Sequence, residues 1–205
     1  MRHHFEDVAH AARGFMPHVE GLALYETVLA ISVSGPIVEV GSYCGKSAIY
    51  LGAAASERGF VVFTIDHHRG SEEMQEGWEH HDADLVNPIT GRMDSLPELR
   101  GNLEAAGLEG VVVPIVGESS VVAQHWSTPI SMLFVDGGHG SKPAHADYEN
   151  WAPKIAEGGF LAIHDVFEDP ADGGRPPYEI YSRALTENGF EQHSSSGSLQ
   201  VLRRC

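Results

Sequence analysis

The chain has 205 residues, and 42% of them are hydrophobic, which is enough to bury one β-sheet between two layers of helices. Its formal net charge of −16 at pH 7 argues against nucleic acid or an anionic membrane as a partner. The sequence contains no apolar run long enough to span a bilayer or to form a signal-peptide core, so we expect a cytoplasmic protein without membrane contact.

The first predicted elements are a polar tail and a helix. Residues 1–17 contain His3, His4 and His10, and we expect them to form a mobile segment of a single domain, 1–205. Residues 18–33 carry apolar side chains at helical spacing, which predicts a helix before the first strand.

Residues 36–47, with the sequence PIVEVGSYCGKS, are the most informative part of the chain. A short apolar run ends in Glu39, a turn punctuated by Gly41 and Gly45 follows, and the residues from Ser47 onward favour a helix. This pattern predicts a strand, a tight loop and a helix N-terminus, the place where a mononucleotide-like cofactor binds in a parallel α/β sheet. The two glycines let the backbone turn sharply and approach a ligand closely.

Two classes of cofactor fit this loop. Residues 41–47 have the form GxxxGKS, which is one residue shorter than the phosphate-binding P-loop. A kinase or ATPase would place Lys46 and Ser47 on phosphates and would use Asp136 as its second acidic residue. The missing residue counts against this alternative, because a P-loop wraps phosphates with a fixed number of backbone N–H groups.

The second strand is predicted at residues 60–65 and ends in Asp66. A carboxylate at this place can accept two hydrogen bonds from the hydroxyls of a ribose. The simpler alternative is that Asp66 caps the following loop. Residues 67–95 form a long insert rich in His, Glu and Asp, which we expect to be a substrate-side loop or lid.

The rest of the chain alternates between strands and helices. We predict strands at 111–116, 130–135 and 159–163, helices at 96–106, 143–156 and 177–188, and a hairpin made of 190–193 and 198–202. Pro114 indicates that the third strand lies at a sheet edge. The sequence therefore predicts an α/β fold, a mostly parallel Rossmann-like sheet with a C-terminal antiparallel hairpin and helices on both faces.

Acids and histidines follow two neighbouring strands of this sheet. Asp136 ends the fourth strand and His139 comes soon after it, while the fifth strand ends in His164 and Asp165. Because parallel strands end at one edge, these side chains should come within metal-coordination reach of one another. Taken singly, Asp136 could cap the next helix and His164 could be a hydrogen-bonded buried histidine. A non-haem iron oxygenase using His139, His164 and Asp136 is a further alternative.

The loop Glu39-x-Gly41-x-x-x-Gly45-x-Ser47 resembles motif I of class I S-adenosylmethionine-dependent methyltransferases. With the DGGH segment at 136–139 and the HD pair at 164–165, the similarity becomes more specific. From about residue 20 to residue 165 the chain resembles small metal-dependent sugar O-methyltransferases of actinobacteria. These include the macrocin and mycinamicin type and the mycobacterial methylmannose polysaccharide 1-O-methyltransferase.

The resemblance implies roles for particular residues. Asp136 would bind a divalent cation, Mg²⁺ or Mn²⁺, and His139 would be the general base. His164 and Asp165 stand where the family pattern has an acid followed by Asp, so both join the predicted metal site. The cofactor, S-adenosylmethionine, would be bound by Glu39, Gly41, Tyr43, Gly45, Ser47, Asp66, Glu118, Ser119 and Asp136.

The implied acceptor is a small molecule with a hydroxyl group, a sugar or glycoside, with the 1-OH of a methylmannose oligosaccharide as one candidate. The cation would lower the pKa of the hydroxyl and His139 would remove its proton. The insert could line the acceptor site, with Arg175 and Tyr178 on the opposite wall. Trp78 would then stack on a sugar face, and the alternative is a solvated acidic loop with a buried tryptophan. The sequence leaves a homodimer open.

Overall fold

The computed structural model describes residues 1–71, 74–78, 81–138, 140–169, 174–187 and 189–205. Within these residues, seven strands form one sheet in the order β3-β2-β1-β4-β5-β7-β6. The parallel strands are β1 (Ile37–Val40), β2 (Val62–Asp66), β3 (Val112–Val116), β4 (Ile130–Val135) and β5 (Ile155–Ile163). Strand β7 (Leu199–Arg204) runs antiparallel to β5 and to β6 (Phe190–Ser196).

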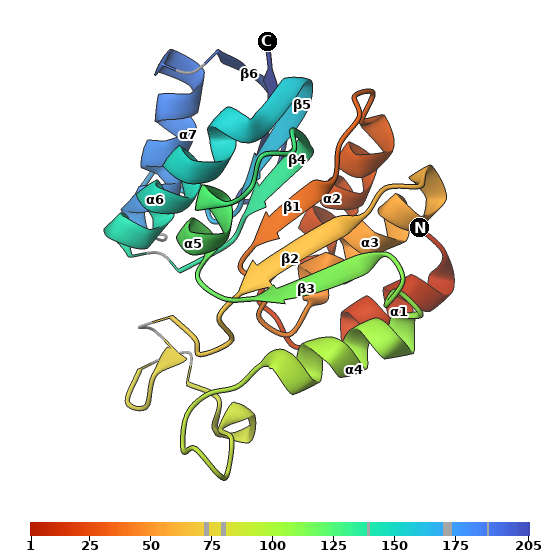
Figure 1. The fold of residues 1–205 in the computed structure, drawn as a ribbon, viewed down its shortest axis with the longest axis vertical. Coiled ribbons are helices and arrows are strands. Elements are labelled where there is room, and N and C mark those ends of the chain that lie inside the picture. The colour runs from red at the N-terminus through yellow and green to blue at the C-terminus, as the bar shows by residue number, and fades with distance from the viewer. Residues whose placement is uncertain (72–73, 79–80, 139, 170–173, 188) are drawn as a thin grey trace.

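Helices cover both faces of the sheet (Figure 1). The first group packs into one core cluster and consists of α1 (His3–Ala11), α2 (His18–Ala30), α3 (Lys46–Arg58) and α4 (Leu96–Ala106). The second group packs into the other cluster and consists of α5 (Ser119–Gln124), α6 (Ser141–Trp151) and α7 (Arg175–Glu187). Two short 3-10 turns complete the described elements, η2 (Ala83–Leu85) and η3 (Ala152–Lys154). The predicted fold class is confirmed.

Most element positions also agree with the prediction. Helix α4 has the bounds expected for it, and β3, which contains Pro114, lies at the sheet edge. The fifth strand begins four residues earlier than expected, because α6 ends at Trp151 and the turn η3 leads directly into Ile155. Among the described residues, no helix is both long and apolar enough to cross a membrane.

The N-terminal segment differs from the prediction. We expected residues 1–17 to be mobile, but His3–Ala11 forms helix α1, which packs against α3 and α4. Phe5, Ala9 and Ala12 are buried and recur at intervals of four and three, so they form one apolar face. Residues 3–11 are therefore a packed helix and not the expected mobile segment.

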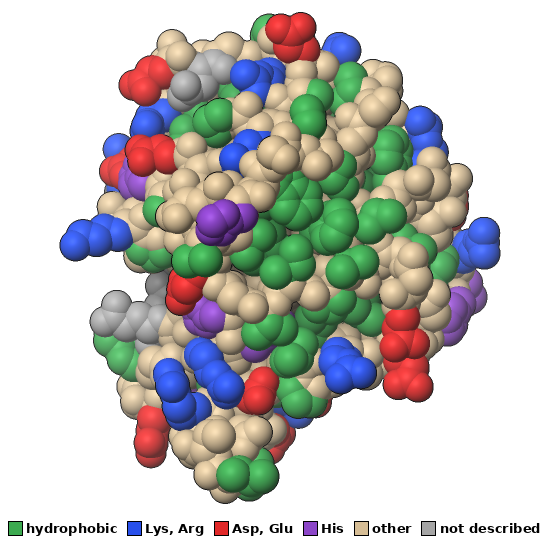
Figure 2. Space-filling model, viewed as in Figure 1, with side chains coloured by type: hydrophobic (Ala, Val, Ile, Leu, Met, Phe, Trp, Pro, Cys, Tyr) green, Lys and Arg blue, Asp and Glu red, His purple; other side chains and the backbone are tan. Residues whose placement is uncertain are grey.

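The insert after β2 projects from the edge of the sheet at which β1 and β2 end (Figure 1). Its described residues are mostly irregular apart from η2 and an antiparallel bridge between Val86 and Met93. Leu85 and Met93 are buried against Cys44 of the glycine loop. Figure 2 shows a notch between the insert and the body of the molecule, at the left of the view. The insert therefore lies beside the strand ends, where the predicted site residues are.

Candidate active site at the carboxyl ends of the strands

The centre of the site lies between β1 and β4, where the strand order changes direction. The two strands are joined up to their ends, and Asp136 N donates to Val40 O at 2.9 Å. Gly41 has a φ of +94°, and a Cβ on it would lie 2.2 Å from the carbonyl oxygen of Asp136. Only glycine fits there, so the glycine loop and the acidic end of β4 are in direct backbone contact.

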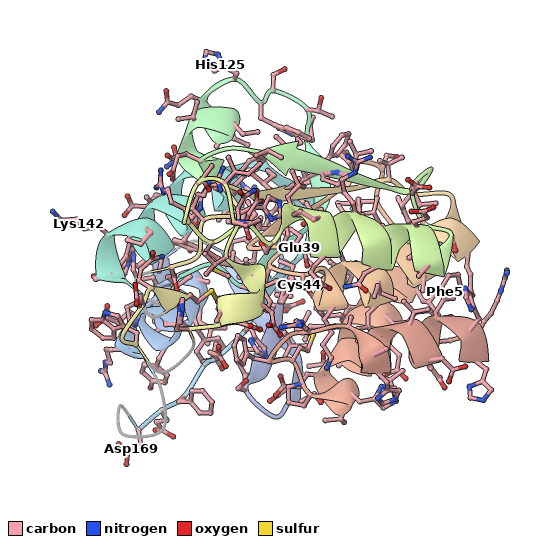
Figure 3. The ribbon with its side chains drawn as sticks, turned by 90° about the horizontal axis from the view of Figure 1, so that it is seen from below. Phe5, Glu39, Cys44, His125, Lys142 and Asp169 are labelled. Atoms are coloured by element: carbon pink, nitrogen blue, oxygen red, sulfur yellow. The ribbon has the colours of Figure 1, made fainter. Side chains whose placement is uncertain are left out.

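Glu39 lies in β1 directly before the glycine loop and has no exposed surface. Ser47 Oγ donates to its Oε1 at 2.5 Å, and Thr64 Oγ1 donates to its Oε2. Burial raises the pKa of Glu39 to about 7, although both hydroxyls oppose the rise and the charge of Asp136 adds to it. Figure 3 shows Glu39 and Cys44 near the centre of the molecule. Two predicted cofactor residues, Glu39 and Ser47, thus fix the start of α3 to the sheet.

Asp66 holds the loop by its backbone. Its Oδ2 accepts hydrogen bonds from Ser42 N at 3.0 Å and Tyr43 N at 2.9 Å, and its Oδ1 accepts one from His68 N at 2.7 Å. The structure shows the loop-capping role that was the simpler alternative for Asp66, and ribose binding by Asp66 stays a prediction. Tyr43 stacks on Phe15, with ring centroids 5.7 Å apart. The loop, the start of the insert and the segment before α2 meet here.

Strained backbone gathers at the same edge. Among the described residues, Tyr43, His68 and Asp165 are the non-glycine residues with positive φ, at 46°, 58° and 55°. Each follows one of the strands that carry the site. Such conformations cost about 1–3 kcal/mol each and are retained mostly at ligand and catalytic sites.

Glu118 and Ser119 follow β3 and begin α5. The hydroxyl of Ser119 accepts a hydrogen bond from Trp151 Nε1 at 2.7 Å and also contacts Asp147. Burial raises the pKa of Asp147 to about 6, and the hydrogen bond between the Ser119 hydroxyl and the Asp147 carboxylate partly opposes the rise. Ser119 thus joins α5 to α6.

The acids after β4 and β5 come together around one histidine. His164 Nδ1 lies 2.9 Å from Asp136 Oδ1 and 3.3 Å from Asp165 Oδ2. The structure thus brings together three of the predicted residues, and one ligand atom from each lies within 4.8 Å of the others. His139, the predicted base, lies outside the described residues.

A fourth member, Glu20 of α2, was missed by the sequence analysis. Its Oε2 lies 2.6 Å from His164 Nε2, and the two side chains are 3% and 4% exposed. The available signal was a charge on an apolar helix face, because Glu20 shares that face with Leu24 and Val28, which are fully buried.

The charge on His164 follows from these neighbours. Burial opposes the charge, but Asp136 and Asp165 outweigh burial and raise the pKa of His164 to about 11. These neighbouring carboxylates favour the protonated ring, and each ring nitrogen already has a carboxylate oxygen at hydrogen-bond distance. The oxygen atoms of Asp136 and Asp165 suit Mg²⁺ or Mn²⁺, so the donor set fits a hard cation through its acids.

A small cavity lies beside this cluster, and the predicted acceptor residues Trp78, Arg175 and Tyr178 are not among the described residues that line it. Pro177 and Ile180 of α7 share this cavity with Asp136 and His164, so the start of α7 forms one wall of the site. Arg175 lies over the ring of Tyr178 at 5.1 Å in the first turn of the same helix. Trp78 in the insert is 54% exposed.

A larger groove of about 710 Å³ lies at the opposite edge of the sheet. It is lined by residues that precede β1 and β2, among them Val33, Pro36 and Phe60. The groove touches none of the predicted site residues. Ligands of open parallel sheets bind at the carboxyl ends of the strands, so the smaller cavity marks the site.

Comparison with known proteins agrees with this geometry. Residues 38–166 match a family model described as a methyltransferase domain. The match begins in β1 and ends just after the HD pair.

Solved structures show the same fold at low sequence identity. Cofactor-bound Rv0187 from Mycobacterium tuberculosis is 16% identical, with a TM-score of 0.68 over 97% of this chain and 87% of that one. The O-methyltransferase TomG from Streptomyces achromogenes, in complex with SAM, is 17% identical, with a TM-score of 0.65 over 100% and 90%. SAH-bound methyltransferase PaMTH1 from Podospora anserina is 11% identical, with a TM-score of 0.68 over 100% and 89%.

Proposed function

The chain belongs to the methyltransferase family whose model covers residues 38–166, a class I S-adenosylmethionine-dependent type, and from this premise we propose a metal-assisted O-methyltransferase. The acceptor is a hydroxyl of a sugar or glycoside. One observation carries the proposal: Gly41 touches the backbone of Asp136, so the cofactor loop and the paired acids form one continuous site.

The cofactor half of the site is built from β1 and β2. Asp66 accepts a hydrogen bond from the backbone of Tyr43 in the loop, and Glu39 accepts one from the hydroxyl of Ser47. Together these bonds fix the position of the N-terminus of α3. Bound S-adenosylmethionine would supply an electrophilic methyl group at this place. The residues of the loop orient it, and orientation accounts for much of the rate in a displacement reaction.

The acceptor half is built from β4 and β5. Asp136 and Asp165 would hold Mg²⁺ or Mn²⁺, which lowers the pKa of a hydroxyl when bound. His139, outside the described residues, is our proposed general base. The start of α7, with Arg175 and Tyr178, and the insert with Trp78 would enclose the sugar. The 1-OH of a methylmannose oligosaccharide is the first acceptor to test.

The kinase alternative fares less well. Lys46 packs along Gly14, where a Cβ would lie 2.9 Å from the lysine Cβ, and Ser47 is buried at 5% exposure and donates to Glu39. The hydroxyl that would contact a magnesium–phosphate group is therefore committed to the sheet. An iron oxygenase through His164 would need a ring nitrogen that now faces a carboxylate.

The test is methyl transfer from labelled S-adenosylmethionine to a panel of sugars and phenols, with and without chelator. We expect transfer to a sugar hydroxyl, lost in chelator and restored by Mg²⁺ or Mn²⁺. Asp136→Asn should abolish turnover, while the matched change Glu168→Gln, at an exposed acid just after β5, should not. Full activity in chelator would refute metal assistance, and tighter binding of ATP than of S-adenosylmethionine by calorimetry would refute the proposed cofactor.

A further inference from the structure

Glu20 reaches the site from a helix that carries none of the predicted site residues. It lies on α2, 144 positions from His164 in the sequence, yet the two side chains meet at 2.6 Å with almost no exposure to solvent. Burying a carboxylate is costly unless it is paired and hydrogen-bonded. An ion pair in this position is poor evidence for a stabilising role, since apolar side chains of similar size often serve stability equally well.

The contacts of His164 show what the pair arranges. One ring nitrogen faces Glu20, and the other faces Asp136 and Asp165. Both nitrogens therefore have a carboxylate oxygen at hydrogen-bond distance, at 2.6 Å for Glu20 and 2.9 Å for Asp136. The ring thus spans the distance between α2 and the two acids, and its tilt sets where those acids lie.

Glu20 is itself held on its other oxygen. Its Oε1 accepts hydrogen bonds from Ser198 N at 2.7 Å and from Ser198 Oγ at 3.2 Å. The turn before it, at Gly197, has a φ of +56°, and a Cβ there would lie 2.1 Å from Glu20 Oε1. Ser198 O in turn accepts from Val166 N at 3.0 Å. The hairpin turn therefore closes on Glu20 and on the segment that follows β5.

We propose that Glu20 is a positioning residue: it holds the His164 ring so that His164 fixes Asp136 and Asp165 as a pair of cation ligands, and His164 itself does not bind the cation. This inference rests on the proposed function, because it assigns a task to Glu20 only if the two acids hold a cation. It replaces the predicted ligand role of His164 by a hydrogen-bonding role.

The experiment compares Glu20→Gln and Glu20→Ala with wild type and with Glu26→Gln, an exposed glutamate on the same helix. The measurements are S-adenosylmethionine and Mn²⁺ affinity by calorimetry, and kcat and KM for the acceptor. For Glu20→Ala we expect Mn²⁺ affinity to fall about 10–100-fold, as is typical when a group that orients a ligand is removed. Cofactor affinity should stay within about twofold, which shows that the variant is folded. The Mn²⁺ affinity of Glu20→Gln should lie between those of wild type and Glu20→Ala, and that of Glu26→Gln should match wild type.

A spectroscopic measurement separates the two roles of His164. Nitrogen-15 NMR of wild type, assigned by comparison with His164→Asn, reports the protons on the two ring nitrogens of His164, and addition of Mg²⁺ should leave them unchanged. Loss of one ring proton on addition of Mg²⁺ would show that His164 is a ligand and overturn the inference. Wild-type Mn²⁺ affinity and kcat in Glu20→Ala would overturn it as well. Failure of the proposed function would differ, because wild type itself would then bind no cofactor or transfer no methyl group.

Discussion

Two buried glutamates, Glu39 and Glu20, serve the two halves of the site in opposite ways. Glu39 has no exposed surface and faces neutral hydroxyls, whereas Glu20 is 3% exposed and faces the charged ring of His164. Hydroxyl donors satisfy hydrogen bonds without neutralising charge, which is why burial still raises the pKa of Glu39 to about 7. In the cofactor half the buried glutamate is therefore paired with the dipoles of two hydroxyl groups, and in the acceptor half it is paired with an ionisable imidazole.

The largest expected effect is a loss of stability when the buried ion pair of the acceptor half is removed. His164→Ala leaves the buried Glu20 with its Ser198 hydrogen bonds but without the imidazole at its Oε2, and removing one member of a buried pair costs about 3–5 kcal/mol. Urea unfolding at pH 7 measures this. The control is His145→Ala, which removes a half-exposed pair with Glu179 at 3.0 Å and should cost about 1 kcal/mol or less. Equal losses for the two variants would contradict the comparison.

The next effect is the pH dependence of stability that Glu39 causes in the cofactor half. Because the pKa of Glu39 is raised from 4.5 to about 7, the folded protein binds a proton that the unfolded chain releases in this range. The contribution of Glu39 to the free energy of unfolding should therefore fall as pH rises from about 4.5 to about 7 and stay constant above it. Glu39→Gln should remove this slope. Wild type and Glu39→Gln with parallel stability profiles from pH 4 to 8 would show that Glu39 does not titrate there.

A smaller effect is expected when one of the two hydroxyl groups on Glu39 is removed. Thr64→Val keeps the shape of the side chain but removes the hydroxyl that donates to Glu39. Leaving a buried acceptor short of a donor costs about 1–3 kcal/mol. The same variant should weaken cofactor binding, measured by calorimetry, because Thr64 and Ser42 share the hydrogen bond that fixes the loop. Thr186→Val, at an exposed position on α7, is the matched control.

The smallest effect lies at the border of the cofactor half. Arg13 binds Asp82 and also Asp84 at 3.1 Å, and so ties the segment between α1 and α2 to the insert. Arg13 and Asp82 are partly exposed and Asp84 is exposed, so Arg13→Ala should change the melting temperature little. It should speed hydrogen exchange of the insert, whereas Arg92→Ala, at an exposed position in the same insert, should not. Unchanged exchange would show that the ion pair does not hold the insert.

The two halves of the site also differ in how well they could be predicted from the sequence. Glu39 and its partner Ser47 are eight positions apart, and Asp66 ends the next strand, so one short motif and one strand pattern were enough to predict that these residues surround the glycine loop. Asp136, His164 and Asp165 were also found, because strand ends in a parallel sheet share an edge.

Glu20 could not be found in this way. Its partners are 144 and 178 positions away, and no local pattern pairs a helix glutamate with a hairpin turn. Helix α1 was missed for a related reason, since its short apolar face has meaning only when α3 and α4 are present to cover it. Tertiary contacts, and not local propensity, determine both features.

The turn at Gly197 and Ser198 has a consequence for the order in which the site is assembled. Ile37 of β1 pairs with Val62 of β2, 25 positions away, whereas Glu20 meets His164 across 144 positions, so the pairing beside the glycine loop closes a much shorter chain segment. Glu20 cannot reach its final place until the hairpin of β6 and β7 has added to β5, because Ser198 closes the last of its hydrogen bonds. During synthesis the cofactor loop would therefore be complete well before the acceptor half. A nascent chain that lacks the hairpin would be expected to bind the cofactor without being able to use it.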